Sequence, residues 1–122
     1  MEKKQFNLIS RVTGLVVFLI ATFTYLATIE PTTSFWDCGE FIASSYKLEV
    51  GHPPGNPVFQ IIARFFTIFA SPENAAMAVN AMNALCSSLT IIFLYLTIMH
   101  MGRRLLEKNG REVLSLSNAI AL

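Results

Sequence analysis

Two apolar stretches without Lys, Arg, Asp or Glu, at residues 12–29 and 84–101, dominate the pattern of hydrophobic and polar positions along the chain. Each reaches the roughly 18-residue minimum for a helix that crosses the hydrocarbon core of a bilayer. We therefore expect an all-α, multi-pass membrane protein. Residues 113–122 are again mostly apolar and predict the start of a third transmembrane helix. On this interpretation the chain is the N-terminal part of a longer protein; a complete two-span protein with a hydrophobic tail is the alternative.

The first stretch also shares a feature with secretory signal peptides, because basic residues precede it at Lys3, Lys4 and Arg11. It is longer than the usual signal-peptide core of about 7–15 apolar residues, and no small-residue cleavage site follows it. An uncleaved transmembrane helix is the favoured interpretation.

Flanking charges predict the orientation of both helices. Residues 1–11 and 102–112 are rich in Lys and Arg, which accumulate on the cytoplasmic side of membrane proteins. In the intervening segment 30–83, most of the charged side chains are acidic. These are Glu30, Asp37, Glu40, Glu49 and Glu73, against Lys47 and Arg64. We expect a cytoplasmic N-terminus, a cytoplasmic basic loop at 102–112 and an outward-facing loop at 30–83.

Composition agrees with a membrane protein. The chain has 122 residues, of which 53% are hydrophobic and 14% charged, whereas soluble domains average about 25% charged residues. This low charge excludes a disordered tail and a basic nucleic-acid-binding protein. The two cysteines, Cys38 and Cys86, are too few for a disulfide framework.

Turn and capping residues predict that the outward loop is folded. Ser34, followed by Asp37, is a capping pattern for a helix at about 35–48, and Gly51 can supply a left-handed residue near its end. The prolines of GHPPGNP, residues 51–57, prevent its continuation. Residues 57–70 are apolar but too short to span the bilayer, so we expect a second amphipathic helix there. A longer helix is predicted to start near Pro72 and to continue through 84–101.

Polar residues of this loop are the candidates for chemistry. Asp37 and Glu40 lie three residues apart on one face of the predicted helix, beside Trp36. Aromatic surroundings desolvate carboxylates and raise their pKa, which suits acid–base catalysis. The simpler interpretation is that Asp37 opposes the helix dipole and that Glu40 is a solvated charge.

Two further residues have open interpretations. His52 lies in the rigid GHPPGNP loop, where it is either a neutral turn residue or a polar group directed at a ligand. Arg64, at the centre of 57–70, can reach lipid phosphate, pair with a loop carboxylate or hold an anionic ligand. No zinc-binding or phosphate-loop pattern is present. Asp37 and Glu40 can bind a divalent cation, but two carboxylates are too few to predict a metal site.

Residues 31–66, with W-D-x-G-E-F at 36–41 and G-H-P-P-G-N-P at 51–57, resemble a bacterial membrane family of unknown function that is common in Bacteroidota. That family is related to the eukaryotic transmembrane protein O-mannosyltransferases. The resemblance implies a GT-C-type glycosyltransferase fold in a bacterial inner membrane. It implies transfer of a mannose-like sugar from a polyprenyl-phosphate donor to Ser or Thr of an acceptor protein on the outer side of the membrane.

The same resemblance implies roles for single residues. Asp37 corresponds to the Asp that acts as catalytic base in the first outward loop of GT-C enzymes, and Glu40 would assist it or bind the acceptor. His52 and Arg64 would contact the donor phosphate, and Trp36 is a further substrate-binding candidate. Two other functions remain open: a non-catalytic scaffold whose outward amphipathic helices dock a partner, and a transporter that uses Asp37 and Glu40 as a cation site.

Overall fold

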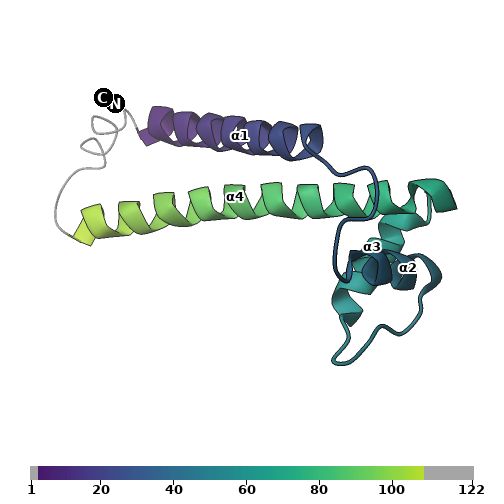
Figure 1. Ribbon diagram of the computed structural model, residues 1–122. Helices are drawn as coiled ribbons and strands as arrows, with labels where there is room; N and C mark the ends of the chain where they lie inside the picture. Colours follow the sequence, from purple (N-terminus) through teal and green to yellow (C-terminus); the bar gives the residue numbers. More distant parts are fainter. Residues whose placement is uncertain (1–2, 109–122) are drawn as a thin grey trace. The chain divides into compact units, whose positions relative to one another are not determined.

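The computed structural model describes residues 3–108, and all regular structure in that part of the chain is helical (Figure 1). The elements are α1 (Lys3–Ala27), α2 (Cys38–Lys47), α3 (Pro57–Thr67), a 3₁₀ turn η1 (Pro72–Asn74) and α4 (Ala75–Lys108). The prediction of an all-α chain is confirmed for these residues. The predicted helix start at 113–122 and the basic loop from residue 109 onward lie outside the described residues.

Two helices, over Lys4–Ala27 and Pro72–Leu105, are long and apolar enough to cross a membrane. Only 6% and 11% of their most apolar segments are buried within the described part of the chain, in contrast to the core helix of a soluble protein. The 34 residues of α4 correspond to about 51 Å at 1.5 Å per residue. Because a hydrocarbon core measures about 30 Å, part of α4 lies beyond it.

The chain divides into two compact units. We call the described residues 3–22 and 88–108 the helix-pair unit, and residues 23–87 the loop unit. In the helix-pair unit, α1 and α4 run antiparallel (Figure 1), since Asn7 contacts Arg103 and Ser10 contacts Tyr95.

Close packing of the helix-pair unit centres on Tyr95. Its hydroxyl donates a hydrogen bond of 2.9 Å to the backbone carbonyl of Ser10. Its ring lies against Gly14, which is buried and where an added Cβ would come within 3.0 Å of a ring carbon. A residue without a side chain lets two membrane helices approach closely, so Gly14 determines the spacing at this point.

The loop unit has a hydrophobic core of its own. Its buried members come from α2, α3 and the first turns of α4, and partly buried aromatic residues surround them. The buried residues are Ile42, Ala63, Ala75, Val79 and Met82, and the surrounding aromatic residues are Tyr46, Phe59 and Phe66. The segment between the two apolar helices is therefore a folded unit.

The first turn of α2 differs from the sequence prediction. The helix begins at Cys38 with Asp37 as its N-cap residue, and not at residue 35 with Ser34 as the cap. The reason is Trp36, whose φ of +62° is left-handed and breaks a helix at that position. The left-handed residue at the end of α2 is also different: it is Leu48, with φ +56°, and not Gly51.

One face of α3 is buried and the other is not. Ala63 and Thr67 face the core of the loop unit. The opposite face exposes large apolar side chains at helical spacing, which are Val58, Ile61, Ile62 and Phe65, with Ile68 and Phe69 following the helix. Pro57 occupies the first turn, where a missing N–H costs nothing, and the helix ends at Thr67, before the predicted limit at residue 70.

We expect Gly14→Leu to lower the thermal stability of the full-length protein in detergent. Overpacking of this kind costs about 1–3 kcal/mol, because the Tyr95 ring already lies at contact distance from position 14. Thr13→Leu, an exposed neighbour on the same helix, is the matched control. Equal unfolding temperatures for the two variants would contradict the close approach at Gly14.

Candidate functional site

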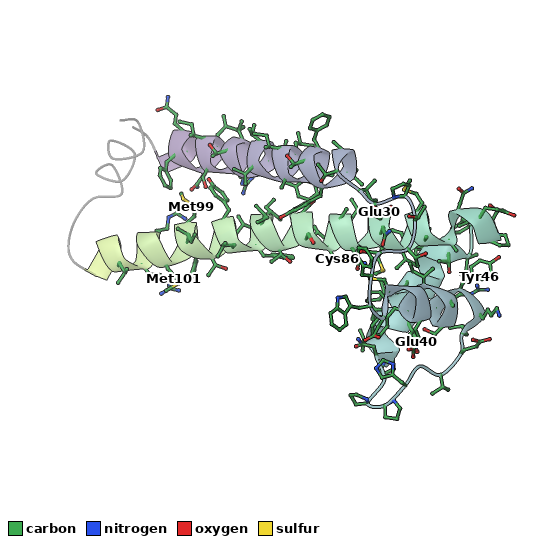
Figure 2. All side chains as sticks on the ribbon, viewed as in Figure 1. Glu30, Glu40, Tyr46, Cys86, Met99 and Met101 are labelled. Carbon is green, nitrogen blue, oxygen red and sulfur yellow. The ribbon has the colours of Figure 1, made fainter. Side chains whose placement is uncertain are left out.

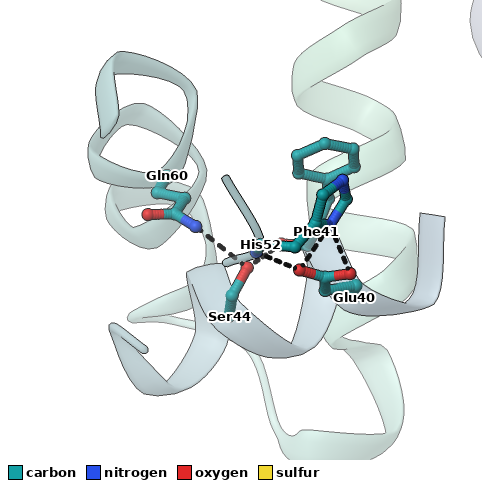
Figure 3. Close-up of polar contacts among 5 residues, drawn as sticks. All are labelled: Glu40, Phe41, Ser44, His52 and Gln60. Atoms are coloured by element: carbon teal, nitrogen blue, oxygen red, sulfur yellow. Dashed lines mark hydrogen bonds and ion pairs between the residues drawn. The ribbon is translucent and has the colours of Figure 1, made fainter. Parts of the chain in front are cut away.

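Glu40 and His52 form the most highly connected polar pair of the loop unit (Figure 3). The imidazole Nδ1 of His52 lies 2.9 Å from Oε1 and 2.8 Å from Oε2 of Glu40. The backbone N–H of His52 donates a further hydrogen bond of 2.7 Å to Oε1. One carboxylate thus fixes both the main chain and the ring of His52.

Local sequence explains how the two residues meet. Glu40 lies in the first turn of α2, and the chain leaves that helix through Leu48 and returns at residue 51. A Cβ at Gly51 would lie 3.2 Å from Oε1 of Glu40 and 3.2 Å from Nε2 of Gln60. Only a glycine allows the loop to approach α2 this closely without moving one of these groups. Immediately after His52, the Pro53–Pro54 bond is cis and Gly55 has a φ of +76°, completing a tight turn.

A second polar contact joins α2 to α3. Nε2 of Gln60 donates to Oγ of Ser44 at 3.2 Å, and Ser44 is buried (Figure 3). Beside it, the rings of Phe41 and Phe59 meet edge to face, with centroids 5.6 Å apart. The centroid of the His52 ring lies 6.5 Å from that of Phe41. These contacts keep the helix that carries Glu40 in place.

Hydrogen bonding perturbs the titration of the pair. The backbone hydrogen bond from His52, followed by that from its ring, lowers the pKa of Glu40 from its ordinary value of 4.5. The hydrogen bond to Glu40 and then its negative charge raise the pKa of His52 above 6.5, with a smaller contribution from the charge of Asp37. Because an ionised carboxylate only accepts hydrogen bonds, Nδ1 carries a proton and Nε2 is the ring atom that changes protonation state.

The signs of these shifts define a pH range for the pair. The contribution of His52 to stability is fully present below its ordinary pKa of 6.5 and is lost as pH rises through the raised value. The contribution of Glu40 is present above 4.5 and is lost as pH falls through the lowered value. Between the two shifted values both groups are charged.

Asp37 lies one turn before Glu40 and is exposed. Its carbonyl accepts the helical hydrogen bond from Phe41, but its carboxylate makes no capping hydrogen bond. The loop that leads to it is held by Asn80 of α4, whose side-chain amide donates to the carbonyls of Glu30 and Thr32 at 2.7 and 3.1 Å. Sequence reasoning missed Asn80; the available signal was two amide side chains, Asn80 and Asn83, in the otherwise apolar start of α4.

The other two candidates occupy different surroundings. Trp36 is 96% exposed. Arg64 is half-buried and donates to the carbonyl of Tyr46, and its guanidinium carbon lies 5.7 Å from the centroid of the Tyr46 ring. Tyr46 is six residues beyond Glu40, about 9 Å along α2, so the structure does not bring Arg64 into the Glu40–His52 pair.

Residues 3–108 contain no group of three or more His, Cys, Asp or Glu side chains placed to hold a metal ion.

Comparisons with known proteins identify the family of this chain. A family model described as the protein O-mannosyl-transferase TMEM260 N-terminal domain matches residues 37–121. A curated relative, protein O-mannosyl-transferase tmem260 of Dictyostelium discoideum, is 32% identical over 85 residues. That alignment covers 68% of this chain but 10% of the relative, so the chain spans about a tenth of the relative's length. No solved structure matches this chain.

We expect Glu40→Gln to lower the pKa of His52. Removal of the negative charge takes away part of the stabilisation of the imidazolium. The pH dependence of His52 carbethoxylation by diethyl pyrocarbonate, followed by peptide mass spectrometry on the full-length protein, reports this pKa because only the unprotonated nitrogen reacts. Glu49→Gln removes an exposed carboxylate of the same loop and is the control. An unchanged midpoint in Glu40→Gln would show that the pair does not form.

Proposed function

Because this chain belongs to the protein O-mannosyl-transferase TMEM260 N-terminal domain family, we propose that it is the N-terminal part of a membrane protein O-mannosyltransferase. The enzyme would move a mannose-like sugar from a polyprenyl-phosphate donor to Ser or Thr hydroxyls of a protein acceptor. The observation that carries the proposal is the contact of His52, from the GHPPGNP loop, with Glu40 beside Asp37 at the start of α2, all inside the matched region.

Asp37 is the proposed catalytic base. A hydroxyl group is not ionised at neutral pH, so its oxygen becomes a good nucleophile when a base takes the proton during attack. The Asp37 carboxylate would accept that proton as the new bond forms between the hydroxyl oxygen and the anomeric carbon. The bond between that carbon and the phosphate oxygen would break, and polyprenyl phosphate would leave. An exposed carboxylate without a capping hydrogen bond suits this role.

His52 is the proposed partner of the donor phosphate. With Nδ1 bonded to Glu40, a protonated ring presents Nε2–H as a charge-assisted donor. Glu40 then acts through His52, as the group that orients the ring and keeps it protonated. The exposed indole of Trp36 offers an apolar surface to substrate. Arg64 donates a hydrogen bond to the carbonyl of Tyr46, so its proposed role is to hold α3 against α2. His52 is then the proposed ligand of the donor phosphate.

The membrane arrangement is also part of the proposal. The basic flanks favour a cytoplasmic N-terminus and an outward-facing loop unit. The resemblance of residues 31–66 to a bacterial membrane family is the ground for proposing a bacterial inner membrane. The apolar helices and the folded loop between them fit a GT-C-type enzyme, in which short helices of the first outward loop carry the base.

A second candidate function has one observation in its favour. The exposed apolar face of α3, together with Phe69 just after the helix, which is 83% exposed, is suited to a docking contact. A non-catalytic scaffold would use that face and would not depend on the carboxylates. Phe66 does not belong to it, because its side chain packs against the core of the loop unit.

We expect Asp37→Asn to reduce sugar transfer by a factor of one hundred or more, on the order of the effect of removing a general base. The assay measures transfer of labelled sugar from polyprenyl phosphate to protein in native membranes that contain the full-length enzyme. Glu49→Gln, an exposed acid in the same loop, should leave transfer unchanged. Full activity of Asp37→Asn at equal protein levels would remove Asp37 from the mechanism.

Substitution of the exposed α3 face separates the two candidates. The double variant Phe65→Ser/Phe69→Ser keeps the buried face of α3 intact, and the enzyme hypothesis expects its specific activity to stay within a few-fold of the wild type. Specific activity is measured in the same transfer assay after correction for the amount of membrane-inserted protein. A wild-type protein without transfer activity, together with loss of a co-purifying partner from this variant, would favour the scaffold.

A further inference from the structure

A pocket of about 280 Å³ lies in the helix-pair unit, near the N-terminal end of α1 and the C-terminal end of α4. Arg11 lines it from α1, and His100 and Arg103 line it from α4. Leu96 and Met99 contribute apolar surface, and Figure 2 shows Met99 on the side of α4 that faces α1. A second recess of similar volume, about 290 Å³, adjoins the pocket and includes Lys4 and Arg11 in its lining.

Among the side chains that the structure describes, the charges near this pocket are all positive. Described side chains of the helix-pair unit, at residues 4–22 and 88–105, include no Asp or Glu. The cationic groups of the pocket therefore have no carboxylate partner among those residues. A cluster of positive charge next to an apolar surface is complementary to a group that has an anionic head and a hydrocarbon body.

Arg103 is held in position to receive such a group. Its Nη2 donates to Oδ1 of Asn7 at 2.6 Å, and its guanidinium carbon lies 5.5 Å from the centroid of the Phe6 ring. A guanidinium has five N–H donors, and Asn7 takes one of them. Its orientation is thus fixed by two contacts while further donors are available for an anion.

The position of the pocket relative to the two uncharged stretches also fits a site for a lipid headgroup. Arg11 directly precedes the uncharged stretch 12–29, and Arg103 follows the stretch 84–101 by two residues. Side chains at these positions lie where the hydrocarbon core gives way to lipid headgroups. We propose that this pocket binds the phosphate of an anionic phospholipid, with Arg11, His100 and Arg103 on the phosphate and Leu96 and Met99 on the start of the acyl chains.

Native mass spectrometry of the full-length protein tests this proposal, with phosphatidylglycerol and phosphatidylcholine added separately in detergent. We expect the wild type to bind phosphatidylglycerol preferentially. Each arginine that donates a charge-assisted hydrogen bond to the phosphate contributes about tenfold in affinity, so Arg11→Gln/Arg103→Gln should weaken binding by more than tenfold. Arg104→Gln, the next residue of α4 and exposed outside the pocket, is the matched control and should bind like the wild type.

Three outcomes would overturn the proposal: equal binding of the two lipids, equal loss in the Arg104→Gln control, or complete displacement of phosphatidylglycerol by inorganic phosphate. The first two would mean general attraction to a basic surface, and the third a site for free phosphate. Arg11→Gln alone keeps the Arg103–Asn7 hydrogen bond and should still lose about tenfold in affinity for phosphatidylglycerol. This single variant keeps the test valid where the double variant fails to fold.

Discussion

The carboxylate of Glu40 accepts hydrogen bonds from both the backbone and the ring of His52, and the geometry of the candidate site depends on this shared acceptor. Without it, the proline-rich loop would have no polar attachment to the first turn of α2. The prolines restrict the loop before it docks, so less conformational entropy is lost when the contact forms. Gly51 removes the side chain that would otherwise keep the two segments apart. A charged pair that is largely exposed can therefore hold a defined geometry.

Sequence patterns predicted the parts of the structure that follow from local physics. Charge-free stretches indicated the long helices, and the residues between Gly51 and Pro57 indicated where α2 stops and α3 starts. The pattern also selected His52 as a candidate for ligand contact. It could not pair His52 with Glu40, because that contact forms between residues twelve positions apart only after the loop folds back on α2.

Other differences between the predicted and observed helix ends arose from backbone conformations that residue type does not predict. Trp36 and Leu48 adopt left-handed conformations that favour glycine, so the start of α2 and its closing residue were misplaced. Arg64 illustrates a different limit. A lone arginine in an apolar helix is compatible with lipid, carboxylate or ligand, and a backbone carbonyl at the end of α2 was not among those alternatives. Tertiary contacts alone distinguish these cases.

The dependence on one shared acceptor has a consequence for how related sequences are compared. A change from Glu to Asp at position 40 would keep the charge but withdraw the carboxylate by one methylene group, so the two acids are not equivalent at this position. Glu40, Gly51 and His52 lie at fixed positions in the sequence and contact one another in the folded loop. Related sequences are therefore best compared at these three positions together, since a change at one of them alters the contacts of the other two.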